Sequence, residues 1–167
     1  MLNKRTNVFE TNSSSVHTLT IGNTINDLIV DKDGYVHVTL PYYGTNYEVY
    51  NNAYDKLCYA ILTVCYTRGI YITFYDEDPT PESMEDWNEC LADLKDTFEY
   101  QSIEECVVTE INRQNRVCYG IKIHPSDCGI DHQSADYSSL DHLLEENNIE
   151  NIHEFIFGNI ILETRCD

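Results

Sequence analysis

The sequence has little positive charge. It contains 29 Asp and Glu residues but only 10 Lys and Arg residues, which gives a formal net charge of −19 and a pI near 4.4. A field of this sign repels free nucleic acid and anionic membranes, and it attracts basic surfaces such as the groove of a nucleic-acid-binding protein. We therefore expect little affinity for free nucleic acid.

Several sequence signatures of chemistry are also missing. None of the 7 cysteines belongs to a C-x-x-C pair, so we interpret them as small buried hydrophobic residues rather than as zinc ligands or disulfides. The G-x-S-x-G motif of a serine hydrolase and a Gly-rich phosphate-binding loop are both absent. We expect no metal and no cofactor.

No apolar run is long enough to span a membrane, and none follows Lys4 and Arg5 as it would in a signal peptide. We therefore expect a cytoplasmic protein with no membrane partner. The composition, 42% hydrophobic and 23% charged, is ordinary for a globular protein. The length of 167 residues suits one domain covering positions 1–167.

Hydrophobic periodicity predicts an α+β fold, with a mainly antiparallel sheet and helices packed on one face or at its ends. Strands are expected at residues 16–21, 27–30, 35–40, 70–75, 107–111, 117–123 and 159–164. Helices are expected at residues 53–67, from 81 to about 100, from 140 to about 144, and at 150–157. The first helix should pack on the sheet through Leu57, Ile61 and Val64.

A polar segment near the N-terminus is the first candidate site. The run Thr-Asn-Ser-Ser-Ser at 11–15 favours a turn, because these side chains compete for backbone hydrogen bonds, and such a turn can hold an anion. His17 follows on a predicted strand at the mouth of this loop, and the alternative is an ordinary surface loop. The candidate catalytic residues here are Asn12, Ser13, Ser14, Ser15 and His17, with Lys4 and Arg5 as phosphate-binding residues.

A second loop is rich in possible metal ligands: His124, Asp127, Cys128, Asp131 and His132. Their spacing matches no standard metal site, so a polar loop is the favoured interpretation. We hypothesise that His132 lies opposite His17 across the end of the sheet. Two histidines, one acting as base and one as acid, are sufficient for metal-free RNA cleavage by the 2′-OH group. The serine loop would then bind the phosphate oxygens.

The helix expected from residue 81 has an acidic face. Its members are Glu85, Asp86, Glu89, Asp93 and Asp96, and Lys95 is the only basic residue in the helix. Such a face is usually just solvated. The functional alternative is a surface that mimics nucleic-acid phosphates for a basic partner.

The motif Asn-x-Phe-Glu-Thr-Asn-Ser-Ser-Ser-x-His at 7–17 resembles a family of small proteins from bacteriophages and other mobile elements of Gram-positive bacteria. Asp-His-Gln-Ser at 131–134 and Phe-Ile-Phe at 155–157 are weaker points of likeness. The better-understood relatives are type II anti-CRISPR proteins, some of which shorten the guide RNA of the effector nuclease.

This resemblance implies an inhibitor of a host RNA-guided nuclease in the bacterial cytoplasm. Its partner would be that nuclease with its guide RNA, which the chain would truncate as a metal-independent ribonuclease. The alternative is a non-enzymatic acidic mimic that occupies the nucleic-acid channel of the nuclease. A phage accessory protein with neither activity is the third possibility.

Overall fold

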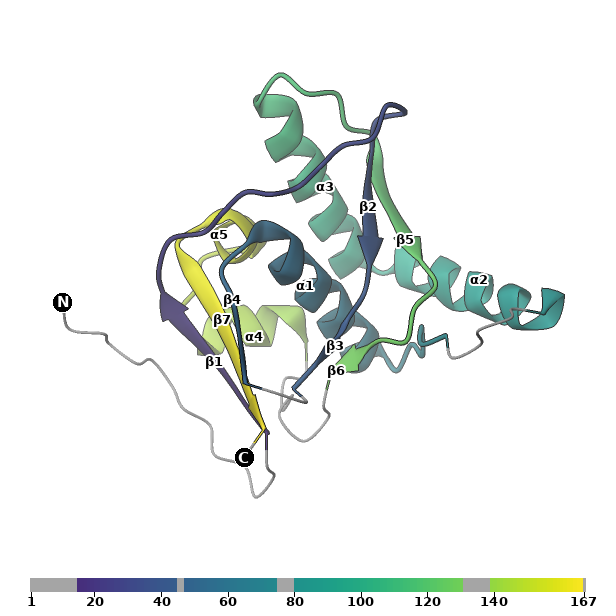
Figure 1. Ribbon diagram of the computed structural model, residues 1–167, viewed down its shortest axis with the longest axis horizontal. Coiled ribbons are helices and arrows are strands. Elements are labelled where there is room, and N and C mark those ends of the chain that lie inside the picture. Colours follow the sequence, from purple (N-terminus) through teal and green to yellow (C-terminus); the bar gives the residue numbers. More distant parts are fainter. Residues whose placement is uncertain (1–14, 45–46, 75–79, 131–138, 167) are drawn as a thin grey trace.

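The structure is a computed structural model that describes residues 15–44, 47–74, 80–130 and 139–166. At positions 15–18, 165 and 166 the description covers the backbone only. The chain has the α+β fold that the sequence predicts, with helices between and around small sheets (Figure 1).

The first and last strands pair in a three-stranded antiparallel sheet. Strand β7 (Ile160–Cys166) lies at its centre, between β1 (Ser15–Ile21) and β4 (Glu48–Tyr50). The register sets Leu19 against Leu162, and both side chains are buried. The strands expected at 16–21 and 159–164 are confirmed.

Two further pairs are parallel, which the sequence did not predict. Strand β2 (Tyr35–Thr39) pairs with β5 (Gly120–His124), and β3 (Tyr42–Tyr43) pairs with β6 (Gly129–Ile130). The described strands therefore form three separate sheets instead of a single one. Each parallel pair joins segments far apart in the chain, because parallel strands need long connections.

Helix α1 (Ala53–Arg68) lies in the middle of the fold. The side chain of Asn52 caps its first turn, and Gly69 ends it with a left-handed backbone at φ 67°. Leu57, Ile61 and Val64 are fully buried, as predicted. Helix α1 as a whole contacts three further helices and the strands β2 and β6. The three helices are α3 (Phe98–Arg113), α4 (Leu140–Glu146) and α5 (Ile152–Phe157).

The segment 81–113 forms two helices. Helix α2 (Pro81–Asp96) begins at the expected residue, after a capping box made by Thr80 and Ser83. It stops at Asp96, because the hydroxyl of Thr97 caps the next helix by accepting a hydrogen bond from Tyr100 N at 3.2 Å. The expected continuous helix to residue 100 is therefore wrong.

The strand expected at 107–111 is also wrong, because these residues belong to α3. Ile103, Val107 and Ile111 are all fully buried. They recur every four residues, which is the spacing of one helix face. The β-branched residues that suggested a strand form the buried stripe of this helix.

Two other expected strands are wrong or shorter than predicted. Residues 70–74 run without strand pairing, and Phe74 N donates a hydrogen bond to Ser126 O at 2.9 Å. The strand expected at 27–30 is reduced to one bridge between Val30 and Val36. No helix within the described ranges is both long and apolar enough to cross a bilayer.

Candidate functional site

Most of the site residues proposed from the sequence lie outside the described residues. They are the candidate catalytic residues Asn12, Ser13, Ser14 and His132 and the candidate phosphate-binding residues Lys4 and Arg5. Ser15 and His17 belong to β1, where the backbone register sets them against Cys166 and Thr164 of β7. The proximity of His17 and His132 stays a prediction.

The acidic face of α2 is exposed as predicted. Its five members, Glu85, Asp86, Glu89, Asp93 and Asp96, are all classed as exposed. Only Trp87 and Leu94 of this helix are buried, and Trp87 Nε1 donates a hydrogen bond to Ile72 O at 3.2 Å. Figure 1 shows α2 extending sideways from the rest of the fold. The face is therefore accessible to a large partner.

A second polar group lies on the β2–β5 pair, and the sequence did not predict it. Strand β2 alternates between buried valines and outward-facing residues, so that His37 points to solvent. Strand β5 does the same, with Lys122 and His124 exposed and Ile121 and Ile123 buried. Because the strands are paired, these alternating positions form one polar surface.

A chain of short hydrogen bonds links three of these side chains. Nδ1 of His37 is 2.6 Å from Nε2 of His124, and the two rings stack with centroids 4.9 Å apart. Nε2 of His37 is also 2.6 Å from Oδ2 of Asp31, in the turn that precedes β2. The other oxygen of Asp31 accepts hydrogen bonds from Asp33 N and Tyr35 N at 2.9 and 2.8 Å.

These contacts fix the protonation of the carboxyl group. The hydrogen bond from His37, followed by that from the Tyr35 backbone, lowers the pKa of Asp31 from 3.8 to about 2. The ionised carboxylate then requires His37 to donate through Nε2–H, which leaves Nδ1 as an acceptor for His124 Nε2–H. In the neutral pair, Nδ1 of His124 is left with a free lone pair and is able to accept a proton.

One cation and two aromatic rings flank this chain of hydrogen bonds. Lys122 Nζ lies 4.0 Å from the centre of the Tyr35 ring, within cation–π range. The rings of Tyr35 and Tyr119 are 6.2 Å apart, and Tyr119 is 69% exposed. The surface thus combines a proton acceptor, a positive charge and stacking surfaces. The only indication of this surface in the sequence is that His37 and Lys122 alternate with apolar residues.

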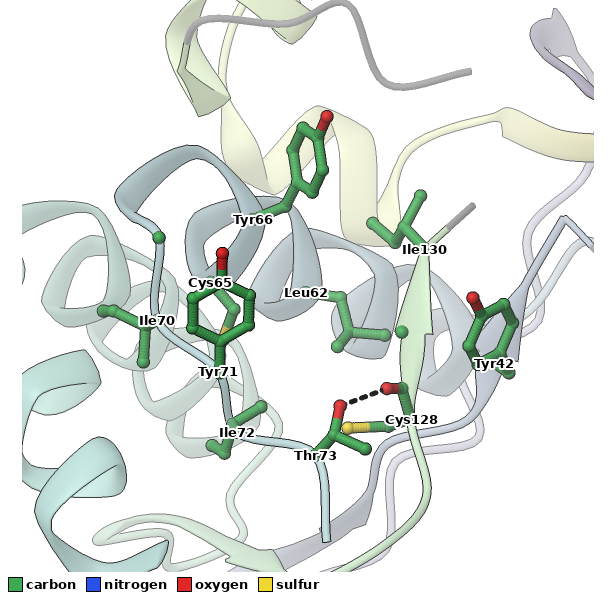
Figure 2. Close-up of a pocket in the computed structure, with 12 residues that line it drawn as sticks. Tyr42, Leu62, Cys65, Tyr66, Ile70, Tyr71, Ile72, Thr73, Cys128 and Ile130 are labelled. Atoms are coloured by element: carbon green, nitrogen blue, oxygen red, sulfur yellow. Dashed lines mark hydrogen bonds between the residues drawn. The ribbon is translucent and has the colours of Figure 1, made fainter. Parts of the chain in front are cut away.

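A cavity of about 390 Å³ lies between the end of α1, residues 70–73 and β6 (Figure 2). Leu62, Ile70 and Ile72 give it apolar walls, and Tyr71, which is 86% exposed, stands at its border. Thr73 Oγ1 donates a hydrogen bond to Cys128 O at 2.6 Å beside it. None of the described residues that line this cavity is charged, and their side chains suit a small, largely apolar ligand.

The cysteines at this cavity are poor nucleophiles. Burial raises the pKa of the Cys65 thiol to about 12, and it also raises the pKa of Cys128. Both side chains are therefore thiols at neutral pH, whereas the thiolate is the reactive form. Within the described ranges, no three His, Cys, Asp or Glu side chains are grouped to hold a metal ion.

Comparison with known proteins yields no relative for this chain. No family model matches it, and neither the curated proteins nor the solved structures include a significant match. The likeness of residues 7–17 to phage proteins therefore remains a resemblance of motifs. The features of the molecule that point to a function are its net charge, the acidic face of α2 and the polar surface of β2–β5.

Proposed function

We propose that this chain inhibits a bacterial RNA-guided nuclease by binding the basic nucleic-acid channel of that enzyme in the cytoplasm. The observation that carries the proposal is the exposed acidic face of α2, which projects from the fold. The identity of the partner comes from the resemblance of residues 7–17 to phage inhibitors. The type of contact, carboxylates of α2 against a basic channel, is inferred from the charge of this face.

The spacing of the acidic face suits a groove that normally holds phosphates. Its members from Glu85 to Asp96 cover about 16 Å of helix axis, at about 1.5 Å per residue. Lys95 is the only basic residue of the helix. A basic channel is charged to bind a row of anions, and the carboxylates of this face present a row of negative charges to it.

Ribonuclease activity is the second candidate. In it Asn12, Ser13, Ser14, Ser15, His17 and His132 would cleave the guide RNA, with Lys4 and Arg5 on the phosphate. The motif resemblance favours it, and so does the position of Ser15 and His17 at the start of a paired strand. The net charge of −19 implies that such cleavage would need RNA already bound to a basic protein.

Neutralising the acidic face tests the first candidate. The variant carries Glu85→Gln, Glu89→Gln, Asp93→Asn and Asp96→Asn, and the readout is DNA cleavage by a type II nuclease loaded with guide RNA. We expect inhibition to weaken at least tenfold and to lose most of its salt dependence.

The matched control removes the same charge elsewhere. Glu105, Asp141, Glu145 and Glu150 are exposed outside α2 and are changed to their amides. This variant should inhibit like the unmodified chain. Equal loss in both variants would show that only net charge matters and would exclude α2 as the contact.

The second candidate is tested in the same assay by running the guide RNA on a gel in the presence of EDTA. Ser14→Ala combined with His17→Ala should prevent guide-RNA shortening if the N-terminal loop is catalytic. Intact guide RNA with the unmodified chain, together with full inhibition, would exclude the ribonuclease and leave the acidic mimic.

A further inference from the structure

The polar surface of β2–β5 combines a proton acceptor, a cation and aromatic rings, which are groups that a metal-free phosphodiesterase can use. We propose that Asp31, His37 and His124 form a proton relay with which this chain cleaves short single-stranded RNA, using Lys122 to bind the phosphate. This site shares no residue with the acidic face of α2 or with the N-terminal loop. It is a separate activity, and its failure would leave the proposed inhibitor function intact.

The relay is held in place before any substrate arrives. Asp31 is fixed by two backbone N–H groups and by His37, and His37 in turn fixes the ring of His124. This order leaves His124 Nδ1 as the terminal proton acceptor of the chain. Preorganised groups of this kind need no rearrangement when charge develops in a transition state.

The position of Lys122 relative to His124 suits a phosphodiester. The two residues lie on the same face of β5, two positions apart, and so are about 7 Å apart along the strand. For a phosphate group placed between them, the Lys122 ammonium would turn from the ring of Tyr35 to contact a phosphate oxygen, and the 2′-OH of the adjoining ribose would lie near the imidazole. Tyr119, which is exposed beside Tyr35, offers a ring on which a neighbouring base can stack.

The reaction balances without a cofactor. His124 Nδ1 takes the proton of the ribose 2′-OH, O2′ forms a bond to phosphorus, and the bond between phosphorus and the 5′-oxygen breaks. The 5′-oxygen takes a proton from water, and the hydroxide that remains removes the proton from His124. The products are a 2′,3′-cyclic phosphate and a 5′-hydroxyl, and no oxidant or reductant is involved.

Each member of the site has its own role. His124 and Lys122 are the catalytic residues, because they contact the reacting groups. His37 and Asp31 are positioning residues that stabilise the positive charge formed on His124.

Tyr54 of α1 also lies at this end of the β2–β5 pair, but its hydroxyl is hydrogen-bonded to the backbone of Thr39. Thr39 N donates to the hydroxyl at 2.9 Å, and the hydroxyl donates to Thr39 O at 3.3 Å. We therefore assign Tyr54 no part in the reaction.

The test uses the purified full chain and the dinucleotide CpA with EDTA present, because a short substrate is repelled least by an acidic protein. We expect a 2′,3′-cyclic product, and no product from the 2′-deoxy analogue. His124→Ala should reduce the rate at least a hundredfold, and added imidazole should restore part of it. Rescue by imidazole would not follow from a purely structural role.

Further variants separate catalysis from folding. Lys122→Gln should weaken cleavage at least tenfold, with Lys122→Arg retaining part of the rate, and Asp31→Asn should lower kcat more than it changes KM. His153→Ala removes an imidazole distant from this surface and should cleave normally, with thermal melts confirming that every variant folds. Absence of product from the unmodified chain, or full activity in His124→Ala, would overturn the proposal.

Discussion

Helices α1 and α2 have the same length but opposite environments. Each has 16 residues, yet eleven residues of α1 are buried and only two of α2 are. α2 carries six acidic side chains, whereas α1 carries one. Most side chains of α1 therefore belong to the core and are not accessible to a partner. α2 contributes Trp87 and Leu94 to the core, and its acidic face is available for binding.

Even the one basic residue in the first half of α1 is part of the interior. Lys56 is fully buried, and its ammonium donates hydrogen bonds to Thr24 Oγ1, Gly158 O and Ile160 O at 2.7, 3.2 and 3.0 Å. Burial lowers the pKa of Lys56 from 10.5 to about 8. The residue therefore joins α1 to the segment between α5 and β7, at the cost of burying a charge.

The largest loss of stability should come from truncating a core side chain of α1. Ile61→Ala should lower the free energy of unfolding by about 2–5 kcal/mol, because it leaves a cavity at a fully buried position. Leu91→Ala in α2, at a half-buried position, should cost clearly less. Urea denaturation measures both, and equal losses would contradict the contrast between the helices.

A smaller loss is expected when Lys56 is replaced by Met, which keeps most of the length of the side chain. The change removes the ammonium from Thr24 Oγ1, Gly158 O and Ile160 O. The Thr24 hydroxyl lies within reach of both carbonyl oxygens but can donate fully to only one of them, so the expected cost is about 1–3 kcal/mol. Lys95→Met, at an exposed position of α2, should leave the unfolding free energy nearly unchanged. A loss with Lys95→Met as large as with Lys56→Met would refute the structural role of the buried ammonium.

The unmodified chain and the Lys56→Met variant can also be compared as the pH changes. Because the folded pKa of Lys56 is about 8 and its usual value is 10.5, the unfolded chain holds more protons between these values. Stability then rises with pH in this range through this residue. The unmodified chain should gain stability relative to Lys56→Met from about pH 8 to 10.5, as measured by urea denaturation at each pH. A constant difference would contradict the lowered pKa.

Removing the cap of α2 should have a modest and local effect. Thr80→Ala removes the hydroxyl that accepts a hydrogen bond from Ser83 N at 3.1 Å, and the expected cost is about 1 kcal/mol. Hydrogen exchange should increase in the first turn of α2 and stay unchanged in α1. Faster exchange throughout α1 would show that the two helices unfold together.

The smallest effect on stability should come from neutralising the acidic face. The four-residue amide variant of α2 should unfold within about 0.5 kcal/mol of the unmodified chain, because exposed substitutions contribute little and like charges on one helix repel. Circular dichroism during urea titration measures this. A large loss would mean that the face has a structural role.

Local signals were sufficient where they were unambiguous. The helix expected at 53–67 agrees at both ends with α1 (Ala53–Arg68), and the start expected at residue 81 agrees with α2 (Pro81–Asp96). The sequence failed at 97–111, where Thr97 starts a new helix and Val107 and Ile111 face the core from a helix instead of a strand. β-Branched residues suit both environments, and tertiary packing decides between them.

The sequence by itself determined the net charge, the acidic face of α2 and the alternation that exposes His37 and Lys122. Only the tertiary structure placed His37 beside His124, which lies 87 positions away in the chain. That contact depends on which strands pair and in which register, because a shift of one residue would turn one imidazole to the opposite face. Periodicity within a strand carries no information on its partner. The relay could therefore be recognised only in the fold.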